Sequence, residues 1–250
     1  MLYRAIFYVL LAVAAVPALA QQDLGNPSSG TDPASVLPPP LRAFRSYMET
    51  EPEMNFQTTF RASSTLLDTK SQGTAEFVTK LPNLLRASMK GSGNTYQYVS
   101  DGTLLTIYNA RSNEYADTAA RASVIGNMTF IAGLMSFQSR IFDFLAALDQ
   151  AVLGGGVKIT SAGSESVNGR RCDRFTVVTQ VEKWDVWVDK APPNLPCKLI
   201  SSDVNDPAAT VQVNEFTWRK APKVDAGTFK FSAPAGSKRV DVGTLLAGPD

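Results

Sequence analysis

Six short strands, separated by turn residues, are predicted between Met54 and Thr118, and this pattern limits the fold more than any other feature of the chain. Residues 54–63 alternate apolar or small side chains with polar ones, as a strand with one buried face does. Pro82 ends the second strand because proline lacks an N–H for the ladder, and Asp101-Gly102 is a typical hairpin turn. Short strands at this spacing predict an antiparallel meander.

Turn residues 68–73 and 91–93 separate the earlier strands of this meander. After residue 123 the apolar residues recur at helical spacing, which predicts one long helix or two short ones over 123–153. Strands then resume, and we place them at 157–167, 170–180, 183–189, 198–204, 210–219 and 228–232. A sheet of about eleven or twelve strands is too wide to stay flat, so it should curl strongly.

The predicted fold class is α+β and mostly antiparallel β. We expect a single domain at 41–242, built as a strongly curved half-barrel of about eleven strands and covered by helices. One cover is the 123–153 segment. The other is a short helix over 41–50, whose Leu41, Phe44, Tyr47 and Met48 share one face and close one end of the sheet.

The ends of the chain are predicted to lie outside this domain. Arg4, an apolar run over 6–16 and Ala18-Leu19-Ala20 have the layout of a cleavable signal peptide at 1–20. The alternative is an uncleaved anchor, although the run is shorter than the roughly 20 residues of a spanning helix. No Cys adjoins Gln21, so we expect a soluble, unlipidated periplasmic chain, with a disordered leader at 21–40 and a loose tail at 243–250.

Composition argues against most enzyme chemistry. The chain has no His and two Cys, so histidine general bases, Ser-His-Asp triads and most zinc sites are not available. It also lacks the glycine-rich phosphate loops of nucleotide enzymes. Without residues 1–20 its basic and acidic residues are equal in number, which argues against nucleic acid. We therefore predict no enzyme activity, no cofactor, no metal and a monomer.

Cys172 and Cys197 have two interpretations. In an oxidising compartment an even number of cysteines favours a disulfide, and the alternative is two separate buried thiols. If the strands at 170–180, 183–189 and 198–204 form a simple meander, a middle strand separates the two cysteines. The bridge is then feasible only beyond the end of that middle strand.

The apolar side chains are the candidate ligand-binding residues. Phe and Met at this density make either a core or an adaptable pocket. A half-barrel under helices encloses a space that side chains need not fill, which favours the pocket for the set as a whole. Trp184, Trp187, Phe216 and Trp218 should pack the other end. The candidates are Phe56, Phe60, Phe77, Leu81, Leu85, Met89, Tyr96, Tyr98, Leu105, Ile107, Met128, Phe130, Leu134, Met135, Phe137 and Phe142.

Several motifs, in their order along the chain, resemble a known group of proteins. Gly73, Lys80-Leu81-Pro82 and Val99-Ser-Asp-Gly102 resemble the periplasmic lipoprotein carrier LolA and its relatives LolB and the RseB sensor domain. Residues 167–172, 184–189, 195–198 and 229–236 resemble more narrowly an uncharacterised family of predicted periplasmic proteins with the same fold. Together the motifs cover roughly residues 40 to 242.

This resemblance implies a function in the cell envelope. It implies binding of a lipid, an acyl chain or a lipoprotein; the alternative is an RseB-like interaction or sensor scaffold with a filled core and an envelope protein partner. In the carrier an arginine precedes the proline and holds the lid closed. The matching residue here is Leu81, and Lys80 points to the opposite face. The carrier's energy-coupled release is therefore not expected to transfer.

Overall fold

The computed structural model describes residues 33–66, 68–91, 93–135, 140–220, 224–225 and 227–247, which belong to one compact unit, Pro33–Asp250. The predicted signal peptide and cleavage site lie outside the described residues. The helices are η1 (Pro33–Val36), α1 (Pro39–Thr50), α2 (Val124–Met135), α3 (Ile141–Val152) and α4 (Val242–Ala247).

Twelve strands form one sheet. The first meander comprises β1 (Glu53–Ser64), β2 (Thr69–Lys80), β3 (Leu84–Gly91), β4 (Asn94–Ser100), β5 (Leu104–Asn109) and β6 (Glu114–Ala119). The second comprises β7 (Lys158–Val167), β8 (Arg170–Val178), β9 (Glu182–Asp189), β10 (Pro196–Asp203) and β11 (Thr210–Arg219); β12 (Lys238–Arg239) is short.

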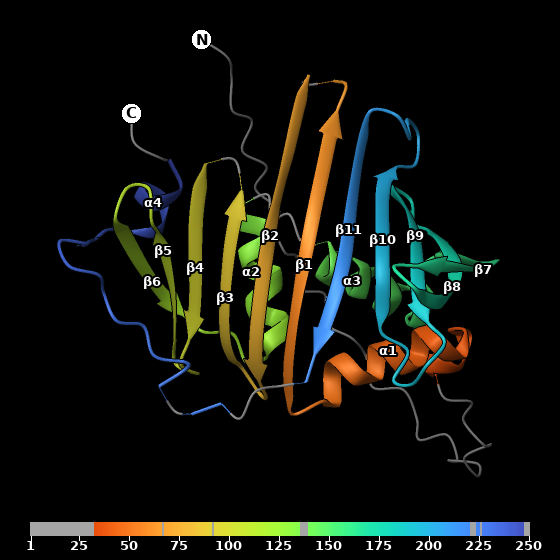
Figure 1. Ribbon diagram of the computed structural model, residues 1–250, viewed down its shortest axis with the longest axis horizontal. Helices are drawn as coiled ribbons and strands as arrows, with labels where there is room; N and C mark the ends of the chain where they lie inside the picture. The colour runs from red at the N-terminus through yellow and green to blue at the C-terminus, as the bar shows by residue number, and fades with distance from the viewer. Residues whose placement is uncertain are drawn as a thin grey trace, which may run out of the picture. The chain divides into compact units, whose positions relative to one another are not determined.

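The two meanders join where β1 pairs with β11, and the spatial order runs from β12 through β6 and β1 to β7 without closing. All pairs are antiparallel except β12 with β6. Figure 1 shows α2 and α3 behind the sheet and α1 at the lower end of its strands. Side chains from distant strands, such as Ile107 and Val177, share one buried cluster with these helices. The predicted curved, helix-covered antiparallel sheet is therefore confirmed, and the helices lie on its concave face.

The predictions for the leader, one turn, one strand and the C-terminal tail differ from the structure. Part of the predicted leader is ordered: η1 and Pro39-Pro40 start the helical region, and Leu37 is buried because it packs into the core. Proline suits the first turn of a helix, whose N–H groups have no intrahelical partner. The predicted turn at 68–73 is shorter, because β2 begins at Thr69 and Gly73 lies inside the strand.

The C-terminal segment accounts for the other two differences. No strand forms over 228–232, because Arg86 donates hydrogen bonds to the carbonyls of Thr228 (3.2 Å) and Lys230 (3.5 Å), and a side chain replaces a ladder there. In place of a loose tail from residue 243, helix α4 forms, and Leu245 is buried in the main cluster. This segment therefore crosses the convex face of β3–β6 and returns to the core.

The disulfide forms between Cys172 and Cys197. Cys172 lies opposite Asp189, the last residue of β9, and a register shift precedes Lys198 on β10. The bridge therefore joins β8 to β10 at the end of β9, where the sequence analysis required it. It is buried with Val167 and Trp187 in a small second cluster, apart from the main core. Trp187 was predicted to pack with the other tryptophans, and it instead faces the opposite side of the sheet because strand residues alternate.

Candidate functional site

The concave face carries one row of large apolar side chains. The strand register places Trp218, Phe56, Phe77, Ala87, Tyr98 and Ile107 side by side across β11, β1, β2, β3, β4 and β5. We call these six residues the apolar row. The ring of Phe56 lies 4.5 Å from that of Phe77 and 4.6 Å from that of Trp218, centroid to centroid. Five residues of the apolar row are buried in the main core, and Trp218 is half-buried against it.

Helix α3 packs its aromatic side chains on this face. The ring of Phe142 contacts that of Phe77 at 5.9 Å, and Phe144 lies between Phe44 of α1 (6.4 Å) and Trp184 of β9 (5.8 Å). Ile141, Leu145 and Leu148 are buried as well, so α3 has one continuous apolar face. This face holds α1, α3 and the sheet together.

Further along the strands, the concave face becomes small and polar. Phe60 pairs with Gly73, which pairs with Gly91, and a Cβ on Gly73 would lie 2.5 Å from the Phe60 Cζ atom. The Phe60 ring therefore covers two glycines that no larger residue can replace without movement. Four buried polar residues continue across β1, β11 and β10, and we call them the polar row: Thr58, Asn214, Gln212 and Ser201.

The polar row ends at a cavity of about 510 Å³, which we call the mouth. Its inner wall includes Gln212 and Ser201, which are only 9% and 4% exposed, and its charged lining residues are Arg140, Glu182, Asp203 and Asp206. Asn214 donates to the Thr58 hydroxyl and Gln212 donates to the Asn214 side-chain oxygen, both at 3.4 Å. The polar row thus links the mouth to the interior.

Arg140, which precedes α3, fixes the helix to the sheet at the mouth. It pairs with Glu182 on β9 and with Asp143 (2.8 Å), and its Nε donates to the Ser201 hydroxyl at 3.4 Å. Its guanidinium lies 5.0 Å from the centre of the Trp184 ring. Burial lowers the pKa of Arg140 despite the neighbouring Asp143, and burial raises the pKa of Asp143. Desolvation therefore opposes both charges, and each depends on the other.

The predicted ligand-binding residues are largely brought together in the main core. Leu81, Tyr96 and Phe130 are half-buried against it. Phe137 lies outside the described residues, and so do the side chains of Leu134 and Met135 in α2. The buried members are Phe56, Phe60, Phe77, Leu85, Met89, Tyr98, Leu105, Ile107, Met128 and Phe142. Whether they bind a ligand stays a prediction.

The sequence analysis missed the polar row and Arg140. Thr58 lies between Phe56 and Phe60 in the period of two, and Asn214 and Gln212 continue the same inward series as Phe216. Polar residues at inward positions were therefore the available signal. The predicted set was chosen by apolar character alone, which excluded them.

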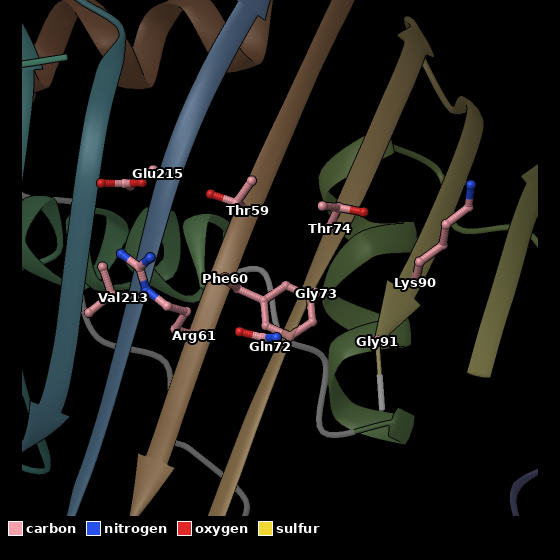
Figure 2. A pocket seen from close by; sticks show the side chains of 10 residues that line it. All are labelled: Thr59, Phe60, Arg61, Gln72, Gly73, Thr74, Lys90, Gly91, Val213 and Glu215. Atoms are coloured by element: carbon pink, nitrogen blue, oxygen red, sulfur yellow. The ribbon is translucent and has the colours of Figure 1, made fainter. Parts of the chain in front are cut away.

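A second cavity, of about 460 Å³, lies on the convex face of the central strands. Figure 2 shows its lining on β11, β1, β2 and β3, with the helices behind the sheet. Glu215, Thr59, Thr74 and Lys90 form one row across it, as the register requires. Phe60, which is buried, and Gly73 and Gly91 form its floor, and the side chains around them are mostly polar or charged.

Neither a metal site nor a membrane span emerges from the described residues. Over residues 33–247, with the gaps given above, no three His, Cys, Asp or Glu side chains gather as metal ligands would. No helix within the same ranges has the length and apolar character needed to cross a bilayer.

Comparison with known proteins places the chain in a family. The model of a family described as a predicted periplasmic protein, DUF2092, matches residues 40–243. The chain belongs to the DUF2092 family. The sequence resemblance to an uncharacterised predicted periplasmic family is thereby confirmed, and no curated protein matches this DUF2092 chain.

Three solved structures are similar to this DUF2092 protein. An uncharacterised conserved protein from Thermus thermophilus is 11% identical, with 81% of this chain and 96% of that chain covered and a TM-score of 0.49. The lipoprotein LppX from Mycobacterium tuberculosis is 12% identical, with 78% and 100% covered and a TM-score of 0.44. A LolA superfamily protein from Nitrosomonas europaea is 9% identical, with 81% and 99% covered and a TM-score of 0.36.

Proposed function

We propose that this DUF2092 protein is a non-enzymatic periplasmic binding protein for a lipid or acyl chain. The bound acyl chain would lie between the concave face of the sheet and helices α2 and α3, in contact with the apolar row. An apolar ligand needs a water-free surface and few directed hydrogen bonds. The concave face offers that surface over several strands.

Helix α2 carries this proposal. Apart from Asn127 and Thr129, its residues are apolar or glycine, and they occur on every side of the helix. A helix that is apolar all round is normally buried all round. Yet Ile125 and Phe130 of α2 are only half-buried. Helix α2 thus presents more apolar surface than the described sheet covers, which a bound chain would cover.

The attachment of α2 is polar at its beginning. The N–H of Val124 donates to the Pro82 carbonyl at 2.8 Å. The fully buried Asn127 amide donates to the Asn83 carbonyl (3.1 Å) and to the Ser100 hydroxyl (3.3 Å), and its oxygen accepts the N–H of Arg121 (2.8 Å). Directed bonds therefore fix the first turn, while non-directional apolar contacts hold the described side chains that follow. An acyl chain could therefore bind beside α2 without breaking these hydrogen bonds.

An interaction scaffold is the second candidate, and the packing of the apolar row favours it. Phe56, Phe77 and Phe142 are at most 1% exposed, and the Phe77 ring contacts the other two, so this part of the interior is filled. The cavities given by the described residues lie at the mouth and on the convex face. In this case a protein partner would bind the surface.

Saturable binding of a fluorescent acyl probe with an uncharged head to the delipidated protein tests the proposal. Ala75, on the concave face between Thr58 and Met89, is 1% exposed. We expect Ala75→Leu to weaken binding at least tenfold, because the larger side chain occupies space that the acyl chain needs. Ala162→Leu, at an exposed position on β7, is the matched control.

Overfilling a core also destabilises it, by about 1–3 kcal/mol. Thermal unfolding of both variants is therefore measured first, and Ala75→Val replaces Ala75→Leu if the latter unfolds. If the wild type binds no apolar probe, or if Ala75→Leu and Ala162→Leu bind equally well, the scaffold is the better function.

A further inference from the structure

The mouth differs from the apolar row in the chemistry that it offers. Its walls combine the hydroxyls of Ser201 and Thr210, the amide of Gln212 and several charged groups. Ser201 and Gln212 are buried, and removing such groups from water is unfavourable unless they make hydrogen bonds. A half-barrel that bound only hydrocarbon would be better served by apolar residues here. The mouth is thus suited to the polar end of an amphiphile.

The charges at the mouth are predominantly negative. Glu182, Asp203 and Asp206 line it, and Arg140 is the single cationic residue among its lining residues. Arg140 is already paired with Glu182 and with Asp143. Its positive charge is therefore compensated by the protein itself, and a phosphate or carboxylate of a ligand would meet Asp203 and Asp206 without an available cation.

The hydrogen-bonding groups at the mouth suit hydroxyls or amines. The carboxylates of Asp203 and Asp206 accept backbone N–H groups of their own turn through one oxygen each, at 2.7 to 3.3 Å. A carboxylate has further lone pairs that can accept from a ligand donor. A hydroxyl or an amine of the ligand can donate a hydrogen bond to these carboxylates.

We infer that the ligand is an amphiphile whose head has no net negative charge and is held at the mouth by hydrogen bonds, while its acyl chain lies against the apolar row. This inference deepens the proposed function and rests on it. It names a class of ligand, amphiphiles with an uncharged hydroxyl-bearing head or a cationic amine head, and excludes fatty acids and anionic phospholipids as preferred ligands.

Three ligands with the same oleyl chain and different heads test the inference. In a competition experiment the delipidated protein carries the uncharged acyl probe. The probe is then displaced by monooleoylglycerol, oleylamine or oleate, each below its critical micelle concentration. We expect oleate to bind at least about tenfold more weakly than the other two in low salt, because like charges repel across a partly desolvated cavity. The difference should shrink at high ionic strength.

Two substitutions locate the effect. Asp203→Asn/Asp206→Asn keeps the oxygens that accept the backbone N–H groups and removes both charges, so oleate should gain about tenfold relative to monooleoylglycerol. Glu76→Gln, on the exposed convex side of β2, is the matched control and should leave the ratio unchanged. Circular dichroism checks that both variants fold.

The possible failures are distinguishable. If the probe itself does not bind, the proposed function and this inference both fall. If the probe binds but oleate competes as well as monooleoylglycerol, or if removing both aspartate charges leaves the ratio unchanged, the acyl site stands and the inference is wrong. Preference for oleylamine over monooleoylglycerol would assign an amine head, and the reverse a hydroxyl head.

Discussion

The two meanders of the sheet are similar in strand number and pairing but are held together differently. In β7–β11 the Cys172–Cys197 disulfide joins strands that are not neighbours. Trp187 packs in the same cluster as the disulfide, and the charged groups of Arg174 and Lys198 lie 4.9 and 4.8 Å from the centre of its ring. Such contacts are attractive. This half is therefore cross-linked covalently and by charged side chains on its convex face.

In β1–β6 the attachments are weaker and run through two elements of different kinds. Helix α2 is fixed by hydrogen bonds at its first turn, and the C-terminal segment lies on the convex face through Phe231, which contacts Tyr108 and Tyr115 at 6.0 and 5.2 Å. Both can separate from the strands without breaking a covalent bond. From this comparison we expect the second meander to be the rigid frame and the cover of the first meander to open.

Removal of the disulfide should have the largest effect on this comparison. For Cys172→Ser/Cys197→Ser we expect the free energy of unfolding to fall by roughly 2–4 kcal/mol, because the unfolded chain gains freedom. Chemical denaturation measures the loss, and thiol labelling without reductant should find no free thiol in the wild type. Hydrogen exchange should accelerate most in β8–β10. Equal acceleration in β2–β4 would show that the two meanders unfold as one unit and that neither is the frame.

Loss of the α2 anchor should have the next largest effect. Asn127→Ala removes an amide that makes three hydrogen bonds and leaves buried partners unsatisfied, so we expect a loss of about 1–3 kcal/mol. Release of a bound acyl probe should become faster, whereas the disulfide-linked strands should keep their exchange protection. Stopped-flow release and hydrogen exchange measure the two effects.

Asn55→Ala is the matched control for this substitution, since Asn55 lies on β1 and alternates with the buried Met54 and Phe56. If Asn127→Ala destabilises the protein but releases the probe at the wild-type rate, α2 is a structural helix and not the cover of the site.

Much of this fold could be predicted from the sequence because it depends on local patterns. Alternation, turn dipeptides and helical spacing predicted the antiparallel sheet, a helical segment at 123–153 as one long helix or two short ones, and the helix at 41–50; the structure has two helices in that segment. The C-terminal segment was less predictable. Phe229 and Phe231 alternate as in a strand, but Arg86 occupies the neighbouring carbonyls, and only the folded chain brings that arginine to them.

The site could be predicted only in part, for a related reason. Apolar character identifies residues that leave water, and it found Phe56, Phe77, Tyr98 and Ile107 of the apolar row. It missed Ala87, and it wrongly placed Trp218 at the other end, because pairing with β1 brings Trp218 to 4.6 Å from Phe56. The contact of Phe60 with Gly73 and Gly91 depends on the register of three strands, which local sequence patterns do not predict. Arg140 reaches Glu182 and Ser201 across the sheet through tertiary packing alone. Local patterns therefore located the interior but not its polar mouth.

Leu81 offers a smaller test in the first meander. It is half-buried against the core, its N–H donates to the Pro52 carbonyl at 2.9 Å, and Lys80 pairs with Glu53 on the other side of the strand (2.9 Å). A fully buried Leu contributes about 1.5–3 kcal/mol, so for Leu81→Ala we expect a loss of about 1 kcal/mol and slightly faster probe release. Leu153→Ala, at a position 85% exposed, is the control.

Leu81→Arg tests whether hydrogen bonds from this position, rather than apolar packing, can hold the 123–153 helices against the sheet. An arginine can donate to carbonyls of the 123–153 helices, and slower release in this variant would show that such carbonyls lie within its reach. Unchanged release in both Leu81 variants would mean that Leu81 is ordinary core.

The smallest expected effect concerns one carboxylate in each meander, Asp101 in the turn between β4 and β5 and Asp173 within β8. The backbone N–H groups of Leu104 and Thr103 lower the pKa of Asp101, and the Ser164 hydroxyl, with Lys190, lowers the pKa of Asp173. A pKa lower in the folded than in the unfolded chain gives stability that is present above the unfolded value, about 3.9, and is lost as the pH falls through the folded value.

Asp101 is exposed and Asp173 is partly exposed, so solvent screens these interactions and each contribution should be small. NMR titration of the two carboxyl carbons should place both pKa values below that of an unfolded reference peptide. Asp101→Asn keeps an oxygen that accepts the turn N–H groups, and it should abolish the Asp101 part of the acid dependence while leaving that of Asp173 intact. If Asp101→Asn also shifts the pKa of Asp173, the two meanders are coupled electrostatically. The second meander would then not be a frame independent of the first.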